Sequence, residues 1–347
     1  MDAPDVISFL AAAEARRMRP ITDDDELVRL AEDGKALPFF RISKDAMGRL
    51  RVEGGGHAGH DNEGRMPFVC DFVQRRVLPL LSTDPSVGSD GPFGPKAGRH
   101  GAERPAVCGT YRLELHDAYS YLPNAAEYEN ALSFGRARDA RESVALFPDP
   151  YQMGDYGGLL TLADEVPWTL KSPVMFFAGT TTGDRAPEKN ARIRACVWSL
   201  AHRDVSLFLI TKVAQMGVEE ACARVPDLRR TFHGHVPIRE GHGFRYGVNI
   251  VGNTACWSRV PQILCSKSVM FHVRHADATW YYPALQEGVH FVGVDAVEDL
   301  PAKRAFCEGN PGFCQAVTLN ANRFCHGFLD SSHAASYAAQ LLGSWSF

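Results

Sequence analysis

The chain has 347 residues, of which 45% are hydrophobic and 10% aromatic, so it can bury a core and is not a disordered protein. Its 37 Lys and Arg residues are balanced by 41 Asp and Glu residues, a formal charge of −4, which argues against a dedicated nucleic-acid-binding protein. A chain of this length predicts two domains of roughly 150 residues each.

The sequence contains no apolar run near the roughly 18 residues that a membrane span needs, so we expect no membrane span. The opening stretch, MDAPDVISFLAAAEARRM, carries an early acid and lacks the basic-then-apolar order of a secretory signal. This pattern favours a cytoplasmic protein, whereas a chain trimmed of its leader would place the protein in a secretory lumen.

The nine cysteines include no CxxC pair, which indicates neither a disulfide framework nor a zinc site. Most are expected to be small buried residues; one bridge near Cys307, Cys314 and Cys325 stays open for a luminal protein. Two glycine-rich stretches hold histidines without a carboxylate or cysteine at ligand spacing: His57 and His60, then His233, His235 and His242. We therefore expect no metal.

Taken in chain order, amphipathic helices are expected at 4–18, 22–33 and 66–82, before a loop rich in glycine and proline at 83–105. Asp23 and Asp25 form a DxD, but in the first turn of a helix, where acids favour the dipole. Strands are expected at 107–115, 130–135, 173–178, 205–210, 246–251, 268–273 and 289–294. Helical patterns separate most of them, for instance 187–200, 213–224 and 256–265.

Strands that alternate with helices predict an α/β chain with mainly parallel sheets. There are too many strands for one compact unit, and VPWTLKSP at 166–173 reads as a junction, so we expect two α/β domains that face one another. Such folds bind ligands beyond the carboxyl ends of their strands. The turns after Leu115, Phe177 and Ile250 are therefore the candidate functional sites.

The turn after Phe177 has the sequence FFAGTTTG, followed by a helix that carries Arg192 and Arg194. Glycines let the backbone approach a ligand, and amides with threonine hydroxyls suit phosphate oxygens. No GKS or GKT follows, so this is not a P-loop. An ordinary strand-to-helix connection remains the alternative.

The turn after Ile250 belongs to RYGVNIVGNTACWSRVP, in which a strand ends at glycine and a helix is expected to begin with Asn253 or Thr254 as its cap. Helical amides there would hold a diphosphate, and Arg259, one turn into the helix, would neutralise its charge. Simple helix capping with a surface arginine is the alternative.

The turn after Leu115 lies in LELHDAYSY, where Asp117 sits at the end of a strand. A carboxylate in that position is a candidate catalytic group, or alternatively a loop cap. His116 and Glu114 are weaker rivals.

The stretch RYGVNIVGNTACWSRVPQILCSKSVMFHV, with the later WYYPALQEGVHFVGV, resembles the core of glycosyltransferase family 90. FFAGTTTG is similar to the family's F-R-G-x-x-T-G turn. LHDAYSYLP, ALSFGRAR and ALFPDPYQMGDYGG are similar to its R-D-Y-P, F-S-F-S-K and Y-P…W-E-G-G elements. The resemblance extends over about residues 107–345, and the first hundred residues match nothing.

The resemblance implies a glycosyltransferase of the GT-B type, in which two Rossmann-like domains face a central cleft. Residues 1–168 would form the acceptor-side domain, 169–330 the UDP-sugar domain, and 331–347 a helix that packs back on the first domain. The enzyme would move a sugar, xylose or glucose being favoured, from a UDP-sugar to a hydroxyl of a glycan or glycoprotein, with inversion and without a cofactor or metal.

Residue roles carried over from the family follow its motifs. Asp117 becomes the general base and Arg259 binds the diphosphate. The other residues expected at the donor are Gly179, Thr180, Thr181, Thr182, Arg192, Arg194, Asn253, Thr254 and Ala255. Ala178 replaces the arginine of F-R-G, so a positive charge is missing there, for which Arg185, Arg192 or Arg194 would substitute.

A second hypothesis is a UDP-sugar-binding protein that has lost catalysis, suggested by Ala178 and by Thr279, which stands where many members have an acid. Ser258 also leaves the register of Arg259 open by one residue. A dehydrogenase is disfavoured because the chain lacks GxGxxG with a downstream acid.

Overall fold

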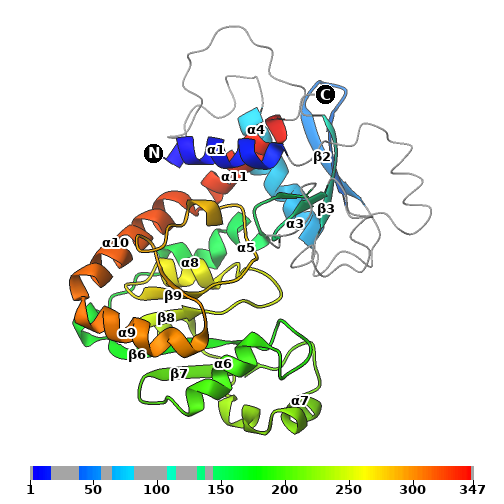
Figure 1. Ribbon diagram of the computed structural model, residues 1–347. Helices are drawn as coiled ribbons and strands as arrows, with labels where there is room; N and C mark the ends of the chain where they lie inside the picture. The colour runs from blue at the N-terminus through cyan, green and yellow to red at the C-terminus, as the bar shows by residue number, and fades with distance from the viewer. Residues whose placement is uncertain are drawn as a thin grey trace. The chain divides into compact units, whose positions relative to one another are not determined.

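The computed structural model describes residues 3–16, 39–55, 65–81, 108–114, 131–136 and 144–344. The chain divides into two compact units, and each is described by itself (Figure 1). Unit 1 comprises Met1–Gly154, Ala278–Pro283 and Asp330–Phe347, and unit 2 comprises Asp155–Asp277 and Ala284–Leu329. Both units contain a sheet with helices packed against it, so the expected α/β class is confirmed.

The division differs from the expected boundary at 168/169, because unit 2 begins at Asp155. The stretch 166–173 is part of unit 2 and not a junction. Lys171, within it, is buried and donates a 2.7 Å hydrogen bond to Asp164. Asp164 also accepts a hydrogen bond from the backbone N–H of Lys267, which ties this segment to the rest of the unit.

Unit 1 has a mixed sheet in the order β2-β1-β3-β4-β5. Its strands are β1 (Phe39–Lys44), β2 (Leu50–Gly55), β3 (Gly109–Glu114), β4 (Ala131–Ser133) and β5 (Val144–Leu146). Only β3, β4 and β5 are parallel, as a Rossmann-like domain requires, whereas β1 is antiparallel to both of its neighbours. The β1–β2 hairpin was not expected; it turns at Gly48, whose φ of 75° suits glycine.

Helices and aromatic rings complete unit 1. Its helical segments are α1 (Ala3–Ala15), α3 (Arg65–Phe72) continued by a π-helical turn (Val73–Val77) into α4 (Leu78–Leu81), α5 (Pro150–Met153) and α11 (Ser331–Gly343). Helix α11 packs on α1, although the two lie at opposite ends of the chain (Figure 1). Trp280 stacks on Tyr337 and donates to Gln152, so the short segment 278–283 is anchored in this unit.

Unit 2 has a parallel sheet in the order β10-β9-β8-β6-β7. Its strands are β6 (Ser172–Thr180), β7 (Ser206–Lys212), β8 (Phe244–Asn249), β9 (Val269–Val273) and β10 (Val292–Val294). Numbered within the unit, this order is 2-1-3-4-5, which is that of flavodoxin-like doubly wound folds. Every one of these strands overlaps a strand expected from the sequence.

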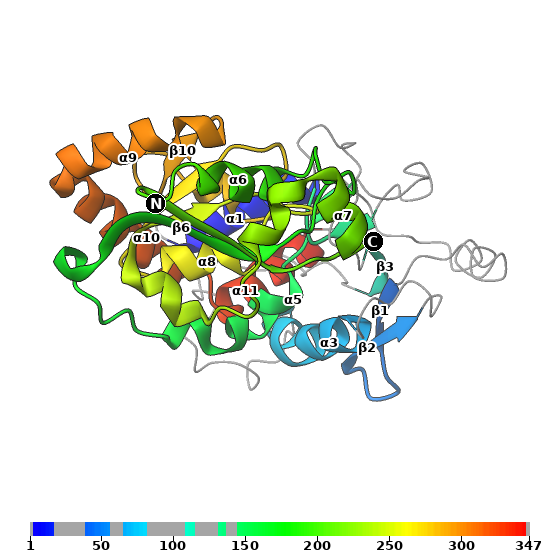
Figure 2. The ribbon, with the colours of Figure 1, turned by 90° about the horizontal axis from the view of Figure 1, so that it is seen from below.

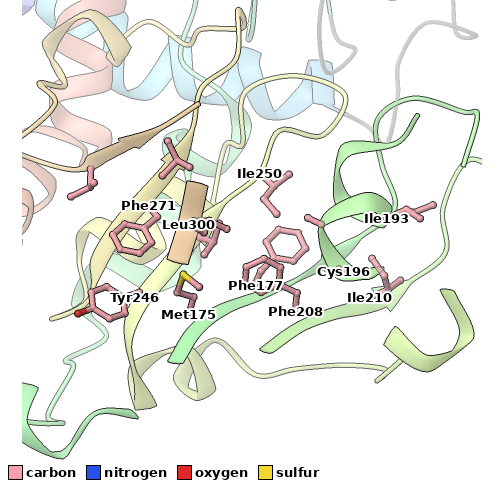
Figure 3. Close-up of a cluster of buried hydrophobic side chains, with 14 of the residues drawn as sticks. Met175, Phe177, Ile193, Cys196, Phe208, Ile210, Tyr246, Ile250, Phe271 and Leu300 are labelled. Carbon is pink, nitrogen blue, oxygen red and sulfur yellow. The ribbon is translucent and has the colours of Figure 1, made fainter. Parts of the chain in front are cut away.

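Helices cover both faces of this sheet. They are α6 (Ala191–Leu200), α7 (Val218–Arg224), α8 (Arg259–Leu264), α9 (Leu300–Gly309) and α10 (Pro311–Phe328). From β6 the chain continues to β7 on one side, and from β8 it continues to β9 on the other. Right-handed crossovers therefore place α6 and α8 on opposite sides of β6 (Figure 2). Phe177 and Phe208 lie in the core against α6, and Tyr246 stacks on Phe271 (Figure 3).

Cys265 and Cys325 form a disulfide that joins the end of α8 to α10. The expected bridge near Cys307, Cys314 and Cys325 therefore involves only Cys325, with a partner that is 60 residues away in sequence and close only in the fold. Cys307 and Cys314 are buried thiols. In the part of the chain that the structure describes, no helix has both the length and the apolar character needed to cross a bilayer.

Candidate functional site

The sheet of unit 2 has one switch point, between β6 and β8. These strands are neighbours, but the chain continues from β6 to β7 on one side and from β8 to β9 on the other. The two connections diverge at the carboxyl ends of the strands, and this is the position at which open α/β sheets bind ligands. The binding residues predicted from the sequence lie at the end of β6, on these two turns, or on the helices that follow them.

The turn after β6 is held by its own polar groups. The hydroxyls of Thr180 and Thr182 lie 3.2 Å apart and are half-buried. The Thr181 hydroxyl is buried instead, donating to the carbonyl of Ala214 at 3.0 Å and accepting from its N–H at 2.8 Å. Gly183 has a φ of 131°, which favours glycine. Thr181 therefore braces the turn, while Thr180 and Thr182 remain candidates for ligand contact.

Asn190, which the sequence analysis did not single out, caps α6 and closes the same turn. Its Oδ1 accepts from the backbone N–H groups of Arg192 and Ile193, both at 3.1 Å. Its Nδ2 donates to the carbonyls of Thr181 and Asp184, at 2.8 and 2.9 Å. Two amides at the start of α6 are thus already hydrogen-bonded within the protein. Because Asn is a preferred N-cap residue, its position just before the helix could have indicated this role from the sequence.

The turn after β8 differs from the expectation. Helix α8 begins at Arg259, so neither Asn253 nor Thr254 is its cap. Pro261 has no N–H and is tolerated only in the first turn of a helix, which explains a start just before it. Asn253 instead accepts a 2.9 Å hydrogen bond from the N–H of Gly183 and so joins the two turns. Its contact with a diphosphate stays a prediction.

The other two residues predicted on this turn are buried. Thr254 is 5% exposed, and its Oγ1 has no hydrogen-bond partner among the described residues. Ala255 is 2% exposed. The last residue of β8, Asn249, is fully buried and donates to Nδ1 of His272, while its Oδ1 has no partner within the described segments. Contact of Thr254 or Ala255 with a ligand also stays a prediction.

Arg259 lies at the switch point. Its guanidinium stacks 4.4 Å above the ring of Phe177, and a Cβ at Gly179 would lie only 2.7 Å from its Nη2. No carboxylate of the described chain pairs with it, and its buried Nε makes no hydrogen bond there. Burial and the nearby charge of Arg192 lower the pKa of Arg259 to about 10, so it stays charged at neutral pH. An unpaired, partly buried cation beside a glycine suits an anionic ligand.

The two arginines of α6 differ sharply. Arg192 is 7% exposed, and its guanidinium donates to both turns. Arg194 is exposed, and its side chain contacts no acceptor among the residues that the structure describes. Arg185 is exposed as well, and contact of either arginine with the donor stays a prediction. Ala178, the departure from the family's arginine, is in β6 directly before Gly179, where Arg259 provides the nearby positive charge.

Asp117, the predicted general base, and its rival His116 lie outside the described residues, and so do His57 and His60. Glu114 is the last residue of β3, in unit 1. Thr279 is buried in unit 1 and accepts a backbone hydrogen bond from Tyr282. Across the described ranges, no three His, Cys, Asp or Glu side chains gather at metal-binding distance. That the protein uses no metal stays a prediction.

The parallel sheet and its switch point define unit 2 as a Rossmann-like domain, and Arg259 at that point is a candidate contact for an anionic ligand. The sequence matches the family described as glycosyl transferase family 90 over residues 157–346, more than half of the chain. The chain belongs to this family, as its motifs predicted. The matched span contains both turns of unit 2 but not Asp117.

Similar solved structures include the C-terminal domain of a glycosyl transferase group 1 family protein, LpcC, from Francisella tularensis. It is 9% identical with a TM-score of 0.31, over 44% of this chain and 85% of that one. Sucrose-phosphate synthase from Thermosynechococcus elongatus is 11% identical with a TM-score of 0.38, over 62% and 59% of the respective chains. No curated protein sequence matches significantly.

Proposed function

We propose that the protein is a metal-independent, inverting glycosyltransferase that moves a sugar from a UDP-sugar to a hydroxyl of a glycan or glycoprotein. Membership of glycosyl transferase family 90 supports sugar transfer. The observation that supports a nucleotide-linked donor is the unpaired Arg259 beside Gly179, which suits a diphosphate. Xylose and glucose are the favoured sugars, by resemblance to the family.

The proposed reaction is a single displacement. The acceptor oxygen attacks the anomeric carbon while Asp117 takes its proton, and the bond from that carbon to the diphosphate oxygen breaks with its electron pair leaving on UDP. Attack opposite the leaving group inverts the anomeric centre through an oxocarbenium-like transition state. Negative charge grows on the departing diphosphate, where Arg259 would stabilise it.

The test is release of UDP from a panel of UDP-sugars, with UDP-xylose and UDP-glucose first, in the presence and absence of glycan acceptors. We expect at least slow hydrolysis of one donor. With an α-linked donor, the sugar should be released first as the β anomer, and NMR of the released sugar measures this. Binding of UDP without hydrolysis or transfer of any donor would instead favour the inactive UDP-sugar-binding protein. Absence of UDP binding would overturn both.

Two substitutions separate the proposed roles. Asp117→Asn should lower transfer by on the order of 10²–10⁴-fold while UDP still binds, because only the proton acceptor is lost. Arg259→Met should weaken UDP binding itself. Arg203→Met, at an exposed arginine just beyond α6, is the matched control and should change neither. Full transfer by the Asp117→Asn variant would remove Asp117 from its role.

A further inference from the structure

Arg192 uses its guanidinium as an internal hydrogen-bond donor. Nη1 donates to the Thr182 hydroxyl at 2.6 Å and to the Thr180 carbonyl at 3.2 Å. Nε lies 3.1 Å from the carbonyl oxygen of Val251 and 3.3 Å from that of Ile250. Each of these two nitrogens thus meets acceptors on a different turn of the site.

The remaining nitrogen, Nη2, completes this arrangement. It contacts Sγ of Cys256 at 3.1 Å, and that thiol in turn donates to the carbonyl of Ile250 at 3.2 Å. The backbone of Gly252 lies against the guanidinium, since a Cβ there would be 2.7 Å from Nη2 and 2.9 Å from the Thr182 hydroxyl. A methyl group at Gly252 would therefore clash with the guanidinium of Arg192.

The acceptors come from two turns that are about 70 residues apart in sequence. A planar guanidinium can serve both at once because its donors diverge in a fixed fork, which an ammonium group does not provide. A second link between the two turns is the 2.9 Å hydrogen bond that the Gly183 N–H donates to Oδ1 of Asn253. Arg192 is therefore placed to set the spacing between the turns.

Arg259 presents the opposite case. It has no carboxylate partner among the described residues and its buried Nε makes no hydrogen bond there, with only the Cys256 thiol as a side-chain acceptor, while Arg192 has acceptors at all three nitrogens. A diphosphate that approached Arg192 would have to displace good bonds, but one that approached Arg259 would gain a partner for an unpaired charge.

We infer that Arg192 is a positioning residue rather than a phosphate ligand: it braces the turns after β6 and β8 so that Arg259 and the Thr180–Thr182 hydroxyls meet the diphosphate of the donor. This inference rests on the proposed function, because it assigns a diphosphate to the site. It revises the role expected from the sequence, in which Arg192 and Arg194 lined the donor phosphates together.

The experiment compares binding of UDP and of uridine, by calorimetry, to four variants of the whole chain. Arg192→Lys should weaken UDP binding about 10- to 100-fold and leave uridine binding unchanged, because only the phosphate part of the site loses its geometry. Gly252→Ala should do the same by displacing the guanidinium without removing its charge. Arg203→Lys, at an exposed arginine just beyond α6, is the matched control and should bind both as the parent does. Arg259→Met should lose most UDP affinity.

Hydrogen exchange without any ligand gives an independent readout. Arg192→Lys should speed exchange of the Gly183 amide, which is bonded to Asn253, while amides of β8 and β9 keep their protection. Parent-like exchange at Gly183 together with parent-like UDP affinity in Arg192→Lys would overturn the inference. If Arg259→Met binds UDP normally, or the parent does not bind UDP, the proposed function fails, and the exchange result still decides whether Arg192 braces the turns.

Discussion

The two edges of the parallel sheet in unit 2, at the amino and carboxyl ends of its strands, differ in how a buried cation is paired. At the amino edge, just before β6, Lys171 is 2% exposed and is paired with Asp164 at 2.7 Å. It also donates to the carbonyl of His242 and to the Ser268 hydroxyl. At the carboxyl edge, Arg259 has no carboxylate partner among the described residues.

Burying a charge is costly unless it is paired and hydrogen-bonded. At the amino edge the chain supplies the counter-charge itself, so that the charges there serve stability. Burial opposes ionisation of Asp164, but the hydrogen bond and charge of Lys171 outweigh it and hold the pKa of Asp164 below its usual range. At the carboxyl edge no described carboxylate supplies a counter-charge to Arg259, and this difference is what supports the proposed binding of a diphosphate there.

The largest effect is expected from breaking the paired edge. Lys171→Met leaves Asp164 buried without its cation, so the free energy of unfolding of unit 2 should fall by about 3–5 kcal/mol. Urea unfolding, followed by hydrogen exchange of β8 amides, measures it. Lys189→Met, at an exposed site, is the control. A loss below about 1 kcal/mol would mean that the pair does not stabilise the unit.

Unit 1 contains a buried acid, Asp149, that forms no salt bridge with a described residue and so extends the comparison. Its Oδ1 accepts from the N–H of Gln152, and its Oδ2 has no partner among the described residues. Burial raises the pKa of Asp149 from 3.8 to about 7, against the effect of backbone hydrogen bonds. The folded state therefore holds a proton that the unfolded state loses, and stability falls as pH rises from about 4 to about 7.

Asp149→Asn keeps an acceptor for the cap but cannot ionise. It should therefore be more stable than the parent at pH 8, by at most about 4 kcal/mol, and nearly equal to it at pH 4. Hydrogen exchange of β5 and α11 amides at both pH values measures the difference. An Asn variant that is less stable at pH 8 would show that Asp149 is ionised and favourably bound in the fold.

Reduction of the Cys265–Cys325 disulfide tests how firmly the carboxyl edge is held, because Cys265 directly follows α8, the helix that carries Arg259. Opening a loop of this length should lower the free energy of unfolding by about 2–4 kcal/mol. The urea midpoint with and without reductant measures it. The double variant Cys265→Ala, Cys325→Ala should be as unstable as the reduced parent and insensitive to reductant; a parent midpoint that reductant does not move would contradict the bridge.

The smallest effect on folding is expected at Arg259. Arg259→Met keeps the packing on Phe177 and removes an unpaired charge, so stability should stay the same or rise by up to about 1 kcal/mol. Thermal unfolding measures it, and UDP should raise the Tm of the parent but not of this variant. A loss of stability as large as that expected for Lys171→Met would show that the charge of Arg259 stabilises the fold, and would contradict the difference between the two edges.

Much of unit 2 was predictable from sequence because its strands are short apolar runs between glycine-rich turns. All five of its strands overlap the expected ones, from β6 to β10. In unit 1 the β1–β2 hairpin was missed, since FFRISK and LRVEGG alternate only weakly between apolar and polar residues. Helices α9 and α10 were not among the expected elements either, because they follow the last strand and so lie outside the alternation of strands and helices.

The candidate site could be located from sequence but not assembled from it. Local patterns determined the α/β class, the family and the two turns, because strand periodicity and motif spacing depend on residues near one another in the chain. Which arginine is braced and which is unpaired, and which cysteine Cys325 joins, depend on residues about 60 positions apart. Only the tertiary structure decides these contacts, since the order of strands in the sheet brings the two turns together.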